Sequence, residues 1–154
     1  MRKMLLSFKA DVYEKVLSGE KIFEHRKVFP NEPVKAYLYV SNPKKAITGI
    51  MYLENKKKIS DWLEEYKYDS LAIQRVEKYL ETQKVVMQIT KFQPTNEIPL
   101  EQLRNELSRF VVPQMYYFIE GKELETYLER ELHPTGKIIE HDFSNITSSM
   151  ICVH

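Results

Sequence analysis

The sequence has little of what several large classes of protein require. Its 154 residues include one cysteine, Cys152, which excludes an internal disulfide framework and is typical of a reducing compartment. No apolar run approaches the roughly 20 residues of a membrane-spanning helix, and the apolar run near the N-terminus is too short for the core of a signal peptide. We therefore predict a cytoplasmic protein with no membrane partner.

Motifs that bind common cofactors are also missing. The four glycines are scattered along the chain, which argues against a dinucleotide-binding loop or a P-loop. The four histidines have no ligand spacing from one another or from Cys152, and no nucleophile-elbow sequence is present. The sequence thus predicts neither a bound cofactor nor a dedicated metal site.

Positive charge is concentrated in the first part of the chain. Residues 1–58 contain 13 Lys and Arg against 6 Asp and Glu, a balance of +7. Residues 59–154 contain 10 against 16, a balance of −6. This uneven distribution favours an anionic ligand at the N-terminal part, although folding can still interleave the two parts in space.

Apolar periodicity and turn signals predict strands separated by helices of unequal length. The predicted strands cover residues 3–8, 21–29, 35–41, 46–54, 84–93 and 110–120. The predicted helices cover residues 10–21, 56–83, 99–108 and 121–134, with a turn at 94–99 and a tail that adds a further short strand. This order is typical of an α+β fold with a mixed or barrel-like sheet, in a single domain over residues 1–154.

Single residues mark particular places in this pattern. Gly19 suits a left-handed cap after the first helix, and Asp69 or Ser70 suits the start of a helix in the middle region. Gly49, inside a strand, indicates a bulge or a close approach of another group. Pro113 indicates that the last main strand is an edge strand or carries a bulge.

Aromatic residues alternate along the strand 35–41. Tyr37 and Tyr39 share one face of this strand, and Leu38 and Val40 share the other. Aromatic side chains on a sheet can stack on bases, as in single-strand RNA binders. They are more often half-buried sheet residues, so both interpretations stay open at this point.

The stretch GEKIFEHR, residues 19–26, places three charges among apolar residues. Glu24 and Arg26 share a strand face, whereas Lys21 has the opposite parity and joins them only if the turn after Gly19 swings it round. An exposed ion pair on a strand contributes little to stability. A buried cluster would instead form a polar pocket for a nucleotide.

These residues spell G-x-K-x-x-E-x-R, which resembles the signature motif of the ASCH (activating signal cointegrator homology) domains of the PUA-like superfamily. Four segments of the sequence are also similar to strands and helices of that family, and the resemblance covers about residues 3–120. Those segments are residues 4–30, 34–54, 98–105 and 111–120.

The resemblance implies a PUA-like β-barrel of mixed strands flanked by helices, with a cleft lined by the motif, and residues 121–154 as an extension. PUA-like relatives bind RNA, and certain small ASCH proteins are amidohydrolases that deacylate N4-acetylcytidine. In that subgroup the catalytic lysine corresponds to Lys21, and a threonine nucleophile occupies the position of Glu24. This chain has no hydroxyl there, which argues against the amidohydrolase reaction.

We therefore predict binding of RNA or a nucleotide-like small molecule by Lys21, Glu24 and Arg26. The resemblance adds two neutral partners, Ser41 and Gln114, and we expect Tyr39 to line the site from the strand that Ser41 ends. Two alternatives remain. One is a hydrolase of a modified nucleoside or of RNA, with Lys21 and Glu24 as acid and base. The other is a regulatory protein whose cleft binds a small effector.

Overall fold

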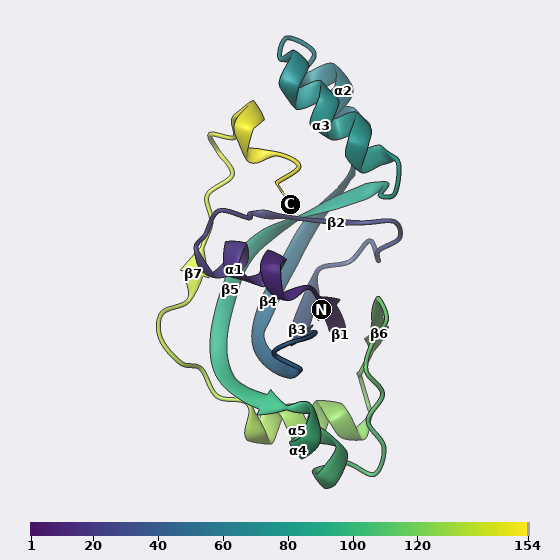
Figure 1. Cartoon of the computed structure of the whole chain (residues 1–154), viewed down its shortest axis with the longest axis vertical. Coiled ribbons are helices and arrows are strands. Elements are labelled where there is room, and N and C mark those ends of the chain that lie inside the picture. Colours follow the sequence, from purple (N-terminus) through teal and green to yellow (C-terminus); the bar gives the residue numbers. More distant parts are fainter. Residues whose placement is uncertain (154) are drawn as a thin grey trace.

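The computed structural model describes residues 1–153, and in this part of the chain seven strands form one mixed sheet (Figure 1). The strand order is β2-β5-β4-β3-β1-β6, with β7 paired to β5. The strands are β1 (Arg2–Phe8), β2 (Phe23–Arg26), β3 (Val34–Val40), β4 (Ala46–Lys58), β5 (Val85–Pro99), β6 (Tyr116–Phe118) and β7 (Ile139–Glu140). Strands β1 and β3 are parallel and the other pairs are antiparallel.

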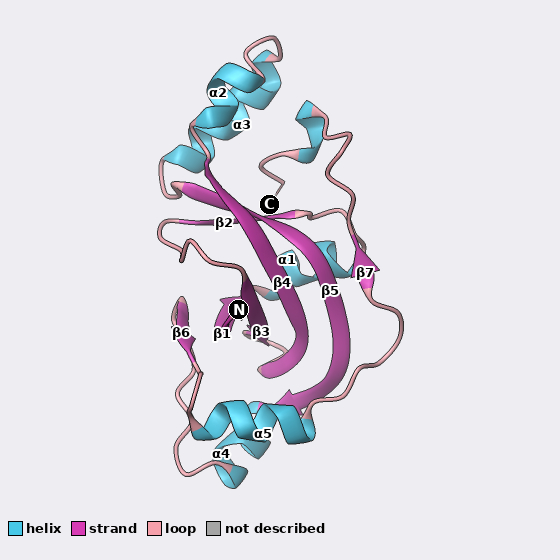
Figure 2. Cartoon of the chain, turned by 180° about the vertical axis from the view of Figure 1, so that it is seen from behind, coloured by secondary structure: helices cyan, strands magenta, loops and turns pink. Residues whose placement is uncertain are grey.

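The long ribbon of β4 and β5 gives the sheet its curl (Figure 2). These strands have 13 and 15 residues, and their pairing shifts register at three places, where extra residues bend and twist the ribbon. The result is a curled half-barrel in an α+β architecture. The fold class predicted from the sequence is therefore confirmed.

The same described residues contain five α-helices and a short 3₁₀ helix, η1. Their bounds are α1 (Ala10–Leu17), α2 (Asp61–Glu65), α3 (Ser70–Leu80), α4 (Leu100–Glu106), α5 (Glu123–Glu131) and η1 (Ser148–Met150). Helices α2 and α3 lie at one end of the molecule, and α4 and α5 lie at the other (Figures 1 and 2). None of the helices of residues 1–153 is long and apolar enough to cross a membrane.

Three apolar clusters hold these elements together. The first packs α1 against one face of the sheet and includes Phe8, Leu38 and Val40. The second packs α4 and α5 against the other face and includes Tyr37. The third joins α2 and α3 to β2, β5 and the C-terminal tail through Trp62. The predicted alternation along β3 is thus confirmed, because its neighbouring residues enter different clusters.

Gly49 allows the close approach that its position in a strand predicts. The register of β4 against β5 shifts between Ile47 and Gly49. A Cβ atom on Gly49 would lie 2.4 Å from Cζ of the buried Phe92 ring, which is too close for any side chain without a shift of the ring. The ring therefore occupies the space that a side chain at residue 49 would take.

The predicted strands 21–29 and 110–120 are shorter in the structure, where β2 and β6 cover only residues 23–26 and 116–118. Two other predicted boundaries are wrong for one shared physical reason. Residues 56–58 continue β4 rather than opening a helix, and residues 94–99 continue β5 rather than forming a turn. Lys57 and Lys58 pair with the start of β5, and its far end pairs with Ala46 and Ile47. Antiparallel partners along the whole length supply hydrogen bonds that local sequence preference does not register.

The predicted helix signals are confirmed in detail. Gly19 has a φ of +80°, the left-handed conformation that glycine adopts without a steric penalty. Asp69 is the N-cap of α3, and its carboxylate accepts hydrogen bonds from the backbone N–H groups of Leu71 and Ala72. Pro113 precedes β6, which is an edge strand because β1 is its only partner in the described sheet.

Candidate functional site

A cleft opens where the half-barrel fails to close. Strands β2 and β6 stand at the two ends of the strand order, and in the described residues no pairing joins them. Between them lies a cleft of about 400 Å³. Its walls come from the end of β1, from β2, from the segment that leads into β6, and from the C-terminal end of α3.

Arg26 connects the two sides of this seam. Its Nη2 atom donates a 2.9 Å hydrogen bond to the backbone oxygen of Ser7, at the end of β1. Its Nε atom lies 3.5 Å from Oε1 of Glu24, and the side chains of Arg26 and Glu24 are 16% and 7% exposed. The arginine therefore holds β2 against β1 and also neutralises a buried carboxylate.

Glu24 has one satisfied and one unsatisfied carboxylate oxygen. Its Oε1 atom accepts a 3.1 Å hydrogen bond from the backbone N–H of His25 and faces Arg26. Its Oε2 atom is buried and has no hydrogen-bond partner within residues 1–153. An unmatched buried acceptor of this kind is costly, unless a ligand supplies a donor.

Lys21 lies on the same cleft although its parity differs from that of Glu24. It precedes the first residue of β2, and its backbone N–H donates to the oxygen of Lys15 at 3.0 Å, which closes the turn at Gly19. Strand alternation therefore does not govern its direction. The structure brings Lys21, Glu24 and Arg26 together on one cleft.

The Lys21 ammonium is almost fully enclosed, with the residue 3% exposed. Its Nζ atom lies 3.5 Å from Nδ1 of His25 and 3.3 Å from the backbone oxygen of Val153. Burial lowers the pKa of Lys21, and the Arg26 charge lowers it further, while Glu24 opposes the shift. Burial is the largest of the three causes.

The three predicted neutral partners lie in different places. Gln114 lines the cleft, beside Met115. Tyr39 is 2% exposed and belongs to the apolar cluster beneath α4 and α5, with its ring 6.1 Å from that of Phe110. Ser41 follows β3 and donates its backbone N–H to the oxygen of Phe8. Neither Tyr39 nor Ser41 lines the cleft, because the face of β3 that carries Tyr39 is turned away from it.

Sequence reasoning missed the wall that α3 supplies. Tyr79 lines the cleft with its ring 4.5 Å from the ring of His25, and Thr82 and Gln83 follow it. The helical spacing of Ile73, Val76 and Tyr79 indicates a packed face, but it does not show which strand that face meets. No local signal in the sequence places α3 against β2.

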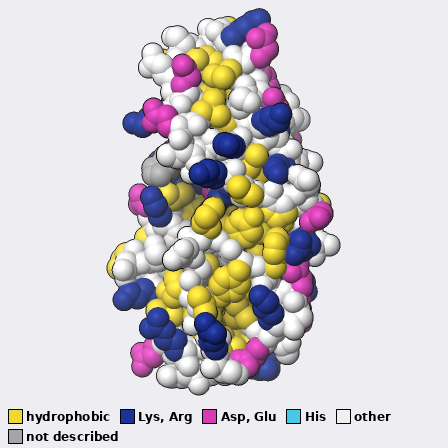
Figure 3. All heavy atoms as spheres, turned by 90° about the vertical axis from the view of Figure 1, so that its right-hand side faces the viewer, with side chains coloured by type: hydrophobic (Ala, Val, Ile, Leu, Met, Phe, Trp, Pro, Cys, Tyr) yellow, Lys and Arg dark blue, Asp and Glu magenta, His cyan; other side chains and the backbone are white. Residues whose placement is uncertain are grey.

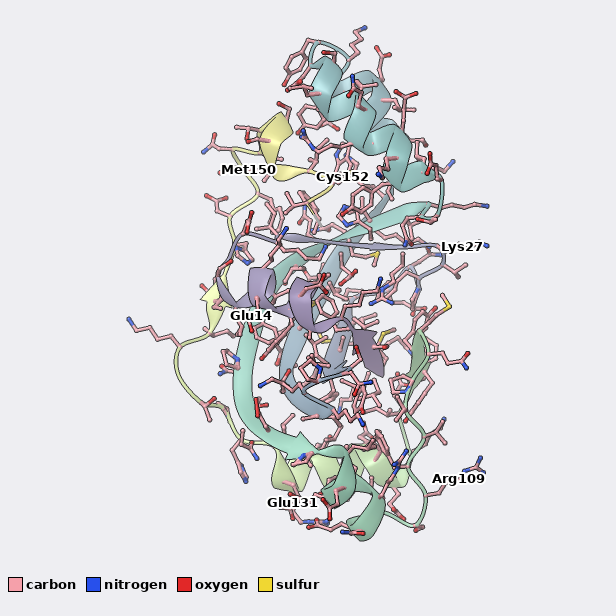
Figure 4. The ribbon with its side chains drawn as sticks, viewed as in Figure 1. Glu14, Lys27, Arg109, Glu131, Met150 and Cys152 are labelled. Atoms are coloured by element: carbon pink, nitrogen blue, oxygen red, sulfur yellow. The ribbon has the colours of Figure 1, made fainter. Side chains whose placement is uncertain are left out.

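The C-terminal tail packs on α3 and contacts Lys21, one of the residues that line the cleft. Arg75 of α3 donates to the backbone oxygen of Ser148 at 2.5 Å, and the Ser148 hydroxyl donates to Asp69 at 2.6 Å. Cys152 then enters the apolar cluster between the tail and α3 (Figure 4), where burial raises the pKa of its thiol to about 11. The tail thereby brings the Val153 oxygen to Lys21.

No family model and no curated protein matches the sequence, but solved structures do. The ASCH protein of Zymomonas mobilis is 21% identical, with 84% of this chain and 95% of that chain covered at a TM-score of 0.63. Its serine-to-alanine variant is 23% identical (83% and 95% covered, TM-score 0.61), and its tyrosine-to-phenylalanine variant is 22% identical (84% and 99% covered, TM-score 0.61).

The chain has the ASCH fold. The resemblance noted at residues 19–26 therefore lies on the strand and turn where the half-barrel of this fold opens. Within residues 1–153 of this ASCH fold, no group of three or more His, Cys, Asp and Glu side chains is arranged to hold a metal ion.

Raising the pH from neutral toward 10.5 is expected to stabilise the native protein relative to a Lys21→Met variant. The folded-state pKa of Lys21 is below its ordinary value of 10.5, so between the two values only the unfolded chain binds the proton, and the free energy of unfolding rises with pH. The variant lacks this contribution. Urea unfolding of both proteins across this range measures it, and a pH-independent difference between them would contradict the buried lysine.

Proposed function

We propose that this ASCH-fold protein binds RNA or a nucleotide-like ligand in the cleft between β2 and β6. The observation that carries the proposal is the unmatched Oε2 atom of Glu24, buried beside Arg26 at a cleft wall. A base with an N–H group matches such an acceptor. The volume of about 400 Å³ is in the range of small-ligand pockets.

The rim of the cleft supports an anionic ligand. Lys9 and Lys27 are exposed and both line the cleft. Figure 3 shows apolar side chains along the middle of this side of the molecule, with Lys and Arg side chains around them. Phosphate groups contact exposed lysines well, whereas bases favour the partly apolar interior.

Binding of a single-stranded RNA oligonucleotide is expected to weaken about sevenfold between about 50 and about 200 mM salt, if two phosphates displace counterions at Lys9 and Lys27. The affinity should be roughly micromolar at physiological salt. Fluorescence anisotropy titrations measure both quantities. Charge removal by Lys9→Gln and Lys27→Gln should flatten the salt dependence, whereas Lys67→Gln, on the exposed α2–α3 connection, should not. Absence of binding at low salt would overturn the proposal.

A hydrolase is the second candidate, favoured by one observation. Burial lowers the pKa of Lys21, and an amine that loses its proton more easily is a better general base. The carboxylate at Glu24 provides no hydroxyl nucleophile for acyl transfer. We expect N4-acetylcytidine to be deacylated slowly or not at all in a chromatographic assay. Robust turnover that disappears in Lys21→Met would place the hydrolase first.

A further inference from the structure

The part of the cleft wall that α3 supplies contains a second unmatched polar atom. The hydroxyl of Tyr79 is buried and has no hydrogen-bond partner within residues 1–153, although this side chain lines the cleft. Its ring is fixed against His25, with centroids 4.5 Å apart and planes inclined by 45°. Tyr79 comes from α3, in a region outside the G-x-K-x-x-E-x-R motif.

The two unmatched atoms differ in what they can bind. The Glu24 carboxylate, paired with Arg26, accepts hydrogen bonds, whereas a tyrosine hydroxyl both donates and accepts. Burial raises the pKa of Tyr79 to about 12, with smaller contributions from Cys152 and Glu24, so the hydroxyl keeps its proton at neutral pH. The cleft thus presents an acceptor from β2 and an available donor from α3.

We propose that Glu24 and Tyr79 together select a base that carries an exocyclic amino group beside an unprotonated ring nitrogen, as cytosine and adenine do. This inference rests on the proposed nucleotide-binding function and names the bases it favours. The amino group donates to Oε2 of Glu24, and the ring nitrogen accepts from the Tyr79 hydroxyl. Both buried atoms are satisfied by one edge of one base.

The same arrangement discriminates against carbonyl bases. Uracil and hypoxanthine place a carbonyl oxygen where cytosine and adenine have the amino group, so that oxygen would face the Glu24 carboxylate with no proton between them. A mismatch of this kind leaves buried polar atoms unpaired. The discrimination provided by one well-paired base edge amounts to about tenfold to 100-fold in affinity.

The test is competition of 5′-nucleotides against a labelled single-stranded RNA on the full chain. CMP and AMP should compete at least about tenfold better than UMP and IMP. Tyr79→Phe should weaken competition by CMP and AMP about threefold to tenfold, because the ring stays packed on His25 while the donor to the ring nitrogen is lost. Tyr68→Phe changes an exposed tyrosine in the connection between α2 and α3, and it should leave the competition by all four nucleotides unchanged.

The outcomes separate this inference from the proposed function. RNA binding with equal competition by all four nucleotides, or competition by CMP and AMP that is unchanged in Tyr79→Phe, would overturn the base selection and leave nucleotide binding standing. No binding of RNA or of any nucleotide would overturn both. Glu24→Gln gives an independent reading, since an amide also donates and should move the preference toward UMP and IMP.

Discussion

Arg26→Ala is expected to abolish ligand binding and to lower the free energy of unfolding by about 3–5 kcal/mol. The guanidinium neutralises the 7%-exposed carboxylate of Glu24 and bonds the Ser7 backbone oxygen across the seam of the half-barrel. Removal of the arginine leaves a buried carboxylate without compensation and releases β2 from β1. Urea unfolding and the RNA titration measure the two effects on the same protein.

Two further variants give this prediction its controls. Arg109→Ala removes an exposed arginine near the end of the molecule that carries α4 and α5 (Figure 4), and it should change stability by no more than about 0.5 kcal/mol, with RNA binding unaltered. Arg26→Lys keeps the charge but loses the planar fork, so it should restore only part of the stability. If Arg26→Ala behaved like Arg109→Ala, the cluster would be an ordinary solvated strand face.

Trp62→Ala is expected to lower the free energy of unfolding by about 3–5 kcal/mol, the usual range for removal of a large buried aromatic side chain. The residue is 2% exposed and its ring meets that of Phe23 edge to face at 5.1 Å. This contact anchors α2, and with it α3, to the first residue of β2. Because α3 supplies Tyr79, loss of the anchor should also weaken ligand binding.

Tyr68→Ala is the matched control for that experiment. Tyr68 lies in the connection between α2 and α3 but is 75% exposed. Its removal should therefore change the free energy of unfolding by at most about 0.5 kcal/mol. Thermal or urea unfolding compares the two variants directly. Full stability of Trp62→Ala would mean that α2 and α3 are held by other contacts, and the position of Tyr79 would then no longer depend on Trp62.

Single residues in the sequence correctly predicted features such as a helix cap and a turn, which depend on the residue itself and its neighbours in the chain. The cap at Asp69 and the left-handed turn at Gly19 depend on neighbouring backbone geometry, and both are confirmed. The close approach predicted at Gly49 is also confirmed, but the ring that makes it, Phe92, comes from β5 and is not indicated by the local sequence. Parity also placed Tyr37 and Tyr39 together on one strand face. Parity does not state which face turns toward the cleft, and the expected role of Tyr39 depended on that direction.

The rest of the site is made by packing between distant segments. The motif located Lys21, Glu24 and Arg26, but another part of the cleft wall comes from the end of α3, and a partner of Lys21 comes from the tail at Val153. The tail has little regular structure and no apolar periodicity to indicate its path. Its position depends on tertiary contacts such as that of Arg75 with Ser148. These two residues are 73 positions apart, so the contact cannot be inferred from the local sequence around either one.

The contact of Lys21 with Val153 can form only late in synthesis of the chain. The two residues are 132 positions apart. At a synthesis rate of about 5–20 residues per second, Val153 is made ~7–26 s after Lys21. During translation, α1 and the first strands have therefore been synthesised while Lys21 still lacks its carbonyl partner. The contact of Lys21 with the tail therefore forms late relative to the motif itself, and a nascent chain halted before residue 148 would carry the motif without this contact.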